Sequence, residues 1–439
     1  MKIVIAGAGK VGFNLAKTLS IGHDVTIIDT NRDALERIVE SLDILPLEGD
    51  VEDAKTYESF ADKRVDLFIA VTNLDNVNLI ATLVADTVLD IQKKFVRLQK
   101  EFFDTDKVKE KLGIDKLIFP THLASESIGA LLHYPKANNV KVFKYTEHKL
   151  ISVMVSSRFV PRSFTMKHTK IVGIERKKEF FIPKKDENIE ILPNDLVYFF
   201  GAVDEIVPLC RELELDSSDA IRRCVVFGGD DLGVRIAKEL LTHNREVKLV
   251  EKDLDLCEKA DEILEGKAAI INSKYSSHEL FEEEYLSNAD MFVAATNNDE
   301  YNIIKSLEAK ESGIKKVVAI NNEMEYYNLM HSLGIVVVRG PKMSAYNSIM
   351  EEISSNGVVI QKSYCGAKAT LFMRRIFADS KVLRKKIKPL KAANILCLIV
   401  REQEIFVLEE KVLLEENDLI VLFATSKEST KAKQWIYGL

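Results

Sequence analysis

The sequence predicts an α/β protein with two parallel-sheet domains in tandem, each followed by a small α+β domain. Three observations predict this fold. Short β-branched strands alternate with helical stretches, a glycine-rich turn follows the first strand, and the same features recur about half a chain length later. Alternating strands and helices are typical of a parallel sheet covered by its crossover helices, so we expect two Rossmann-like domains.

The internal repeat is the strongest organisational signal in the chain. Three segments recur in the same order: residues 3–12 at 224–233, residues 67–75 at 291–299, and residues 194–200 at 417–423. Their offsets are 221, 224 and 223 residues. Matches that keep their order at a nearly constant offset indicate an internal duplication.

The first part of each copy carries the alternation of strands and helices. Strands are expected near residues 3–6, 25–28, 67–71 and 95–98, and again near 224–227, 247–250, 291–294 and 317–320. A helix is predicted over residues 124–133, because Ile128, Leu131 and Leu132 stand at helical spacing and Pro135 disfavours helical geometry before it. Its counterpart is expected from residue 343 to 353.

The last part of each copy has a different pattern. In the first copy, short strands near 140–145, 150–155 and 196–200 are separated by turn and charge-rich segments without a glycine-rich loop. The pattern therefore predicts four domains: a Rossmann-like domain at 1–135, a small α+β domain at 136–218, a second Rossmann-like domain at 219–355 and a second small α+β domain at 356–439.

Composition and charge narrow the classes of function. Hydrophobic residues make up 46% and charged residues 29% of the chain, as in an ordinary soluble globular protein. The formal net charge of −7 provides no positive field that would favour a nucleic-acid ligand. The longest apolar runs are about six to eight residues, whereas a membrane span needs ~20. The chain starts directly with a strand pattern, so we expect no signal peptide and a cytoplasmic location.

Cysteine and histidine spacing gives no sign of a metal site. The cysteines are Cys210, Cys224, Cys257, Cys365 and Cys397. Their number is odd and no two stand at a Cys-x-x-Cys spacing, which is typical of reduced thiols in a cytoplasmic protein. The eight histidines include no His-x-x-x-His pair, so we expect no metal ligand set.

The glycine-rich turn of the first copy has the pattern of a nucleotide site. Gly7-x-Gly9-x-x-Gly12 follows a strand and opens a helix. Gly7 permits the tight turn, Gly9 lets the backbone approach a pyrophosphate, and Gly12 lets the helix pack close to the strand. The helix N-terminus then offers N–H groups and a partial positive charge to phosphates. The alternative is a structural glycine turn that has lost its ligand.

A carboxylate stands where such a site would bind a ribose. Asp29 ends the next strand, seventeen residues after Gly12. A carboxylate at this place can accept hydrogen bonds from ribose hydroxyls and would repel a 2′-phosphate, which favours NAD or an adenine nucleotide over NADP.

Two more segments follow strands at the edge where ligands of parallel sheets bind. Gly49-Asp50 follows a short strand on the expected adenine side, and Thr72-Asn73 follows the strand at 67–71. For Gly49-Asp50 the alternative is an ordinary turn, and for Thr72-Asn73 it is capping of the helix that contains Asn78.

The second copy departs from the first at the positions that would hold the ligand. Asp230 replaces Gly9, and Asp231 adds a second acidic side chain. Like charges at a phosphate site oppose binding by a few kcal/mol unless a cation intervenes. Glu251 keeps the ribose position, but Asn272-Ser273 replaces the Gly-Asp pair. We therefore predict that the second copy binds no dinucleotide tightly.

Together these features resemble a known family. They are the glycine motif with Lys10 and Val11, Asp29, Gly49-Asp50, the segment 70–78, the helical segment 125–132 and the duplication over nearly the full length. The chain resembles the regulatory subunits of bacterial and archaeal Trk potassium uptake systems, the TrkA type. Members of that family consist of two RCK units, also called KTN units, in tandem.

The resemblance implies a function and a ligand. Such subunits form a ring, expected here to be a tetramer of this double-unit chain, on the inner face of the membrane beneath a Trk-type potassium-translocating subunit. They bind NAD(H), with ATP or ADP as alternatives, and the ligand changes the shape of the ring. By motif position the site residues would be Gly7, Ala8, Gly9, Lys10, Val11, Gly12, Asp29, Gly49, Asp50, Thr72, Asn73 and Arg97. Arg97 matches an arginine that the family places near phosphate; the alternative is a surface arginine at a strand end.

Two other functions are open. RCK units also serve other cation channels and antiporters, so the partner could be one of those. A dinucleotide fold also suits an NAD-dependent oxidoreductase. Against an enzyme, we find no separate substrate domain and no His/Asp or Tyr/Lys grouping for acid–base chemistry. The basic stretches at 167–185 and 374–391 could contact a membrane or transporter, or could be solvated faces.

Overall fold

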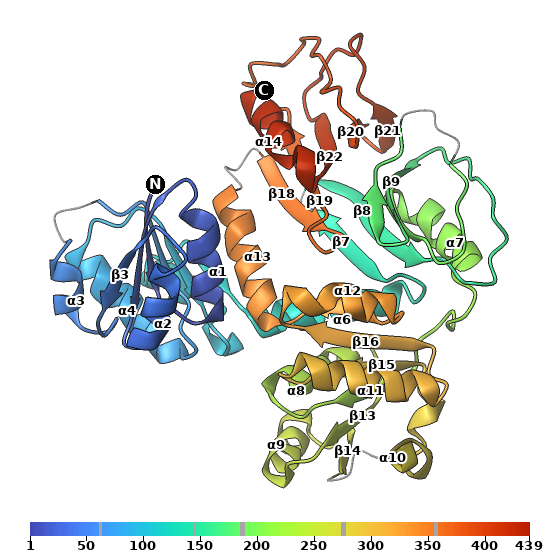
Figure 1. Cartoon of the computed structure of the whole chain (residues 1–439), viewed down its shortest axis with the longest axis horizontal. Coiled ribbons are helices and arrows are strands. Elements are labelled where there is room, and N and C mark those ends of the chain that lie inside the picture. The colour runs from blue at the N-terminus through green and yellow to red at the C-terminus, as the bar shows by residue number, and fades with distance from the viewer. Residues whose placement is uncertain (61–63, 144, 185–188, 274–277, 355–358) are drawn as a thin grey trace. The chain divides into compact units, whose positions relative to one another are not determined.

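The computed structural model describes residues 1–60, 64–143, 145–184, 189–273, 278–354 and 359–439 (Figure 1). In this part of the chain the strands form two six-stranded and two five-stranded sheets. Parallel pairs build the six-stranded sheets, and antiparallel pairs build the five-stranded ones. The predicted fold class is therefore confirmed: two Rossmann-like parallel sheets, each followed by a small α+β part.

The first parallel sheet has the strand order of a doubly wound fold. Its strands, in order across the sheet, are β3 (Leu45–Glu48), β2 (Asp24–Asp29), β1 (Lys2–Ala6), β4 (Leu67–Ala70), β5 (Lys94–Arg97) and β6 (Lys116–Ile118). Its helices are α1 (Lys10–Leu19), α2 (Arg32–Val39), α3 (Ala54–Glu58), α4 (Asp75–Val88) and α5 (Asp106–Lys111). The strand order reverses between β1 and β4, which opens a crevice beyond their carboxyl ends. Val4 and Phe68, from β1 and β4, share one buried core with Ala81 and Ala85 of α4.

The second parallel sheet repeats this order. Its strands are β14 (Ala269–Asn272), β13 (Glu246–Glu251), β12 (Arg223–Phe227), β15 (Met291–Ala294), β16 (Lys316–Asn321) and β17 (Val336–Arg339). Its helices are α8 (Asp231–Thr242), α9 (Leu254–Leu264), α10 (His278–Glu283), α11 (Asp299–Glu311) and α12 (Met324–Ser332). The strands expected near 3–6, 25–28, 67–71 and 95–98, and their counterparts in the second copy, lie within one or two residues of the observed ones. Strands β6, β14 and β17 were not predicted.

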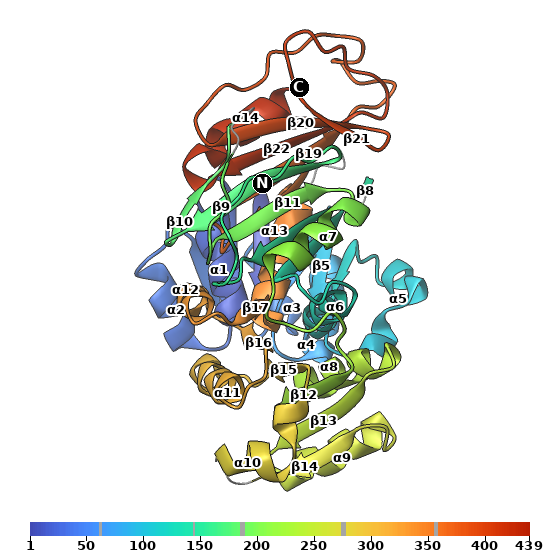
Figure 2. The ribbon, with the colours of Figure 1, turned by 90° about the vertical axis from the view of Figure 1, so that its right-hand side faces the viewer.

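The two antiparallel sheets share a core. One has the order β10 (Glu179–Phe181), β9 (Thr169–Arg176), β11 (Leu196–Gly201), β8 (Thr146–Met154) and β7 (Asn139–Phe143). The other has the order β18 (Val359–Tyr364), β19 (Ala369–Arg375), β22 (Leu419–Thr425), β20 (Ile395–Arg401) and β21 (Glu404–Val407). Helix α7 (Val203–Leu213) belongs to the first and α14 (Ser429–Gly438) to the second. Phe200 and Phe423 meet between the sheets with ring centroids 5.4 Å apart, so the small domains pack face to face (Figure 2).

The two crossover helices are exchanged between the halves. The chain forms two compact units, residues 1–124 with 339–350 and residues 125–338 with 351–439. Most of α13 (Pro341–Ser354), which comes from the second half, therefore belongs with the first parallel sheet. Most of α6 (Pro120–His133), from the first half, belongs with the second sheet, where His133 meets His243 at the end of α8 with ring centroids 5.0 Å apart. Each half thus packs most of its crossover helix against the parallel sheet of the other half.

Candidate functional site

The chain leaves β1 through a sharp turn that glycine alone permits at two places. Gly7 has a φ of 111°, which L side chains rarely adopt. A Cβ atom on Gly12 would lie 1.9 Å from the carbonyl oxygen of Gly7. Gly9 differs, because its φ is −65° and a Cβ atom there would meet no described heavy atom within 4 Å. The middle glycine therefore leaves open space beside the start of α1.

The N-terminus of α1 is built to attract an anion. Gly9 is its N-cap, and among the described residues no side chain caps it. The first N–H groups of a helix lack partners within the helix, and the helix dipole adds partial positive charge. Lys10 is exposed in the first turn and Val11 is buried. Phosphate is one of the anions that such an open helix start can bind.

Asp29 holds the turn from the neighbouring strand. One carboxylate oxygen accepts a hydrogen bond from the Ala8 N–H at 2.6 Å, and the other accepts from the Asn31 N–H at 2.8 Å. Each oxygen has a second lone pair, so the carboxylate can still accept from the hydroxyls of a ribose. Asp29 is therefore placed beside the turn, at the carboxyl end of β2.

A buried asparagine joins the ends of β4 and β5. The Asn78 carbonyl oxygen accepts from the Thr72 N–H at 2.8 Å and the Thr72 hydroxyl at 2.7 Å. Its amide nitrogen donates to the Arg97 carbonyl oxygen at 2.8 Å. The Thr72 hydroxyl is thus engaged within the protein, which supports the alternative of a structural role. The sequence placed Asn78 in the helix after Thr72-Asn73 but did not predict that it organises the site, because its burial cannot be read from a single sequence.

Arg97 is a buried cation with little to pair with. Its side chain is 8% exposed at the carboxyl end of β5, and its Nη1 donates to the Asn73 side-chain oxygen at 3.3 Å. Its Nε has no hydrogen-bond partner among the described residues. Burial lowers the pKa of Arg97, opposed by the Asp75 carboxylate. A buried guanidinium that lacks partners is costly, so an anion such as phosphate suits this place. The alternative of a surface arginine is wrong.

Gly49-Asp50 forms a closed local turn. The Asp50 carboxylate accepts from the Glu52 N–H at 2.9 Å, and the Asp50 carbonyl oxygen accepts from the Thr56 hydroxyl at 2.7 Å. A Cβ atom on Gly49 would lie 2.8 Å from the Thr56 methyl carbon. Asp50 is exposed at the end of β3. These contacts account for both residues as a turn and leave the Asp50 side chain open to solvent.

The second copy repeats the hydrogen bonds of the buried asparagine but not the open helix start. Asn302 accepts from Thr296 and donates to the Ile320 carbonyl oxygen, as Asn78 does with Thr72 and Arg97. Asp230 caps α8 by accepting from the Leu232 and Gly233 N–H groups, both at 3.2 Å. Burial raises the pKa of Asp230, opposed by these two hydrogen bonds.

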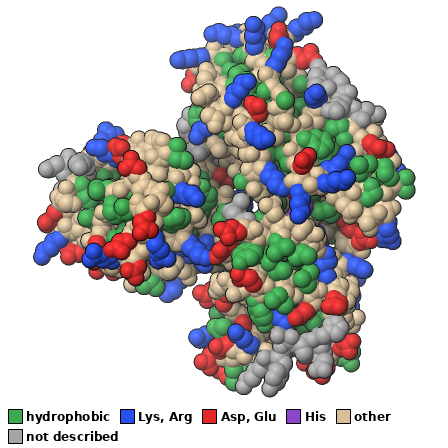
Figure 3. All heavy atoms as spheres, in the orientation of Figure 1, with side chains coloured by type: hydrophobic (Ala, Val, Ile, Leu, Met, Phe, Trp, Pro, Cys, Tyr) green, Lys and Arg blue, Asp and Glu red, His purple; other side chains and the backbone are tan. Residues whose placement is uncertain are grey.

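Two further surfaces lie in the small domains. Figure 3 shows Lys and Arg side chains gathered over the part formed by α14 and the β19–β20 connection. The exposed cations of that connection are Lys381, Arg384, Lys385, Lys386, Lys388 and Lys391. The predicted basic stretch at 374–391 therefore faces solvent over much of its length.

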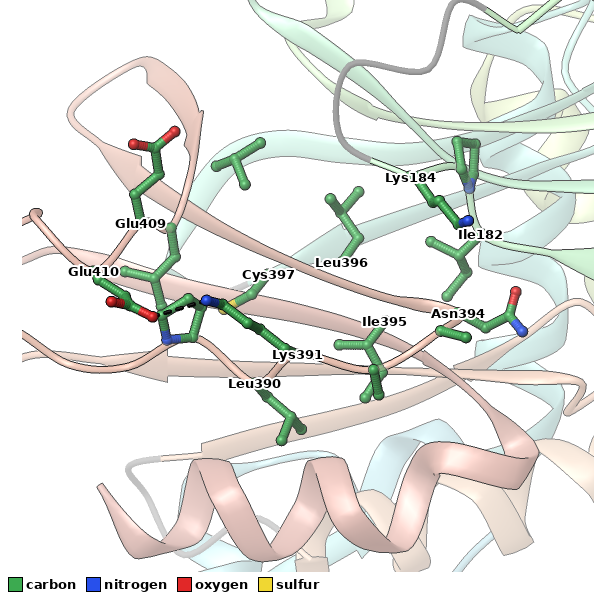
Figure 4. Close-up of a pocket in the computed structure, with 16 residues that line it drawn as sticks. Ile182, Lys184, Leu390, Lys391, Asn394, Ile395, Leu396, Cys397, Glu409 and Glu410 are labelled. Carbon is green, nitrogen blue, oxygen red and sulfur yellow. Dashed lines mark hydrogen bonds and ion pairs between the residues drawn. The ribbon is translucent and has the colours of Figure 1, made fainter.

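A hollow of about 690 Å³ opens beside this connection (Figure 4). Apolar side chains such as Ile182, Leu390 and Ile395 line it, and an ion pair between Lys391 and Glu410, 2.8 Å long, lies at its side. Burial holds the pKa of the Cys397 thiol in its wall well above its usual range, so the thiol stays protonated. The hollow offers an apolar surface and lacks the helix start found at the glycine turn.

No group of side chains in the described residues could hold a metal ion, and no helix in that part of the chain is long and apolar enough to cross a membrane.

The fold and the site define a class of protein: a duplicated Rossmann-type chain with one open and one closed glycine turn. The family model of the TrkA-N domain matches residues 3–120 and again 224–341. The chain belongs to the TrkA family of Trk system potassium uptake proteins, as the predicted resemblance stated.

Two relatives and one solved structure illustrate the similarity. The chain is 31% identical to the Trk system potassium uptake protein TrkA of Halomonas elongata, over 97% of this chain and 96% of that protein. It is 28% identical to the TrkA homolog of Archaeoglobus fulgidus over 99% of both chains. Its fold resembles the GsuK channel bound to NAD with a TM-score of 0.63 at 14% identity, covering 100% of this chain and 79% of that one.

Proposed function

We propose that the chain is a nucleotide-sensing regulatory subunit that gates a Trk-type potassium-translocating membrane protein and catalyses no reaction. One observation carries the sensing part: the open N-terminus of α1 at Gly9 lies in a fold that also buries a poorly paired cation, Arg97. The names of the relatives, which are potassium uptake proteins, support the transport role. We propose the cytoplasm and the inner membrane face as its location and the four predicted domains as its parts.

Asn73 contacts the Arg97 cation, and its counterpart in the second copy contacts a helix start. In the second copy, the counterpart Asn297 donates to the side chain of the N-cap residue of α8 at 2.6 Å. Asn73 therefore occupies the position from which a group at the N-cap of α1 can be reached, and Arg97 contacts Asn73. A phosphate beside Gly9 would meet the helix N–H groups on one side and this Asn73–Arg97 pair on the other.

We propose NAD(H) as the ligand, with ATP or ADP as alternatives. Asp29 at the carboxyl end of β2 favours an unmodified ribose hydroxyl over a 2′-phosphate. The proposed residues are those predicted from the sequence. Gly7, Ala8, Gly9, Lys10, Val11, Gly12 and Arg97 would serve the phosphates, Asp29, Gly49 and Asp50 the ribose and adenine side, and Thr72 and Asn73 the crevice between β1 and β4. The GsuK channel bound to NAD, which shares this fold, supports the choice.

The mechanism needs two states and a difference in affinity. A ligand shifts an equilibrium only as far as it binds one state better than the other. A ten- to hundredfold difference supplies ~1.4–2.7 kcal/mol per site. Several sites in one assembly could together move a gate between closed and open populations.

We propose that the chain assembles with copies of itself into a ring, a tetramer of this double-unit chain. The corresponding helices α4 and α11 expose apolar side chains at equivalent positions. Ile80 and Leu83 are 41% and 43% exposed, and Ile304 and Leu307 are 52% and 38% exposed. Apolar patches repeated on both halves of a duplicated chain fit contacts between like subunits.

The test is calorimetric titration of the full chain with NADH, NAD, ATP and ADP, repeated on Gly9→Asp. The backbone at Gly9 accepts any residue, so the variant should fold and lose the main binding event. Gly22→Asp is the control, because Gly22 is also an exposed glycine without a described neighbour within 4 Å of a Cβ atom. Unchanged affinity in Gly9→Asp would overturn the proposed site, and turnover of NADH with a keto acid would overturn the proposal that the chain is no enzyme.

A further inference from the structure

The start of α8 in the second half already holds an anion. One oxygen of the Asp230 carboxylate accepts from the Leu232 and Gly233 N–H groups, both at 3.2 Å. The other oxygen accepts from the Asn297 side-chain amide at 2.6 Å. These are a helix N-terminus and a donor from the neighbouring strand end, which are the groups that a phosphate would use in the first half.

The two turns differ in this side chain and not in their backbone. Gly9 has φ −65° and ψ −177°, and Asp230 has φ −73° and ψ −179°. The glycines that begin the turns, Gly7 and Gly228, have φ values of 111° and 113°. The space that stays open beside Gly9 is therefore the space that the Asp230 carboxylate fills in the second half.

The cation of the first half is missing in the second. The Asn78 amide donates to the carbonyl oxygen of Arg97, and the Asn302 amide donates to that of Ile320, so Ile320 stands where Arg97 stands. Ile320 is fully buried. The second half thus carries a built-in carboxylate without the guanidinium, and the first half carries the guanidinium without a carboxylate.

The second half also carries a longer acid at the ribose position. Glu251 accepts from the Gly229 N–H at 2.6 Å with one oxygen, and from the Lys252 and Asp253 N–H groups at 2.8 and 3.0 Å with the other. A Cβ atom on Gly229 would lie 2.8 Å from the Glu251 Cβ, so the longer acid folds over the turn. In the first half Ala8 and the shorter Asp29 take these places.

We propose that Asp230 is an internal anion that takes the place of a nucleotide phosphate, so that the second half stays in one fixed state and the chain binds a single nucleotide. This inference rests on the proposed function, since it assigns sensing to the first half alone. Asp230 is then the residue that decides which half responds. Removing its side chain should reopen an anion site at the start of α8.

The test uses Asp230→Gly in the full chain, in a Gly9→Asp background that closes the first site. The probe is inorganic phosphate, and the readout is the melting temperature. Asp230→Gly should melt lower than its parent without phosphate, because the helix has lost its cap. Phosphate in roughly tenfold excess over its half-saturating concentration should raise the melting temperature again, by about 1–2 °C, while the parent stays unchanged.

Asp253→Gly is the matched control. Asp253 caps α9 in the same way, accepting from the Asp255 and Leu256 N–H groups at 2.9 and 3.3 Å. This variant should lose stability without any recovery in phosphate. If Asp230→Gly also shows no phosphate-dependent recovery, Asp230 is an ordinary helix cap and the inference is wrong. Because no nucleotide is used, this result is independent of whether the unmodified chain binds one.

Discussion

The hydroxyls of Thr18 and Tyr346 share a hydrogen bond of 2.8 Å, although the two residues come from different halves of the chain. Thr18 lies in α1, the helix that starts at the open glycine turn, and Tyr346 lies in α13. Helix α1, which starts at the open glycine turn, is therefore hydrogen-bonded directly to α13.

Tyr346→Phe should destabilise the protein by about 0.5–1.5 kcal/mol, the net contribution of one such hydrogen bond. Urea unfolding of the variant and the parent measures this loss. Tyr285→Phe serves as the control, since the Tyr285 side chain is 70% exposed, and it should change stability little. An equal effect of both substitutions would show that the Thr18 contact contributes nothing.

Arg97→Met should separate binding from stability. The methionine keeps an unbranched side chain and removes a buried charge that has few partners, so the unliganded protein should be as stable as the parent or more stable. Nucleotide affinity should fall roughly ten- to hundredfold, as expected for the loss of one charge-assisted contact to phosphate. Calorimetry and thermal melts measure the two effects.

Arg64→Met is the control for this substitution. Arg64 is exposed just before β4, at the amino ends of the strands, and its Nε lies 4.0 Å from the Asp66 carboxylate. Neither affinity nor stability should change. A loss of stability in Arg97→Met, with affinity retained, would place Arg97 in the framework and not in the site.

Asn78→Leu should cost more than about 3 kcal/mol of unfolding free energy, because it leaves buried backbone groups at the ends of β4 and β5 without partners. Asn302→Leu should cost a similar amount, since the second half has the same network. The exposed Asn76→Leu is the control. Urea unfolding measures the free energy of unfolding of each variant. A loss well below 3 kcal/mol in both buried variants would mean that these amides do not stabilise the fold.

Lys316 should give the stability of the protein a pH dependence above pH 8. Complete burial lowers the pKa of Lys316 to about 8 from the usual lysine value of 10.5, although Glu214 and Cys210 oppose the shift. Between these two pH values Lys316 is protonated in the unfolded chain and neutral in the folded protein. The free energy of unfolding should therefore rise with pH across this window, by up to roughly 3 kcal/mol.

Lys316→Met should remove that rise, whereas the exposed neighbour Lys315→Met should retain it. Chemical unfolding at pH 7.5, 9 and 10.5 provides the comparison. The same slope in all three proteins would contradict the lowered pKa of Lys316.

The sequence was sufficient to predict elements that depend on a local pattern of residues. Runs such as Val225-Val226-Phe227 predict buried strands, and the glycine spacing predicts the turn at Gly7 because its backbone admits no side chain. Strands β6, β14 and β17 were not predicted, although β4, β5 and β15, which were predicted, are no longer than four residues. The division into four domains and the site residues remain predictions.

Long-range contacts could not be predicted from a single sequence. Nothing in the neighbourhood of Thr18 or Tyr346 indicates that they meet, because the contact depends on which half each crossover helix joins. Asp230 was predicted to repel phosphate. That it caps α8 and binds Asn297 follows only once β15 is placed beside β12.

The exchange of α6 and α13 has an evolutionary consequence. An ancestor with a single copy would have had one crossover helix and no second half against which to pack it. Two such molecules would therefore have had to pair, each packing its crossover helix against the parallel sheet of the other. Gene fusion would then have preserved an older dimer within one polypeptide. One of the two glycine turns could then change its sequence while the other kept its open helix start.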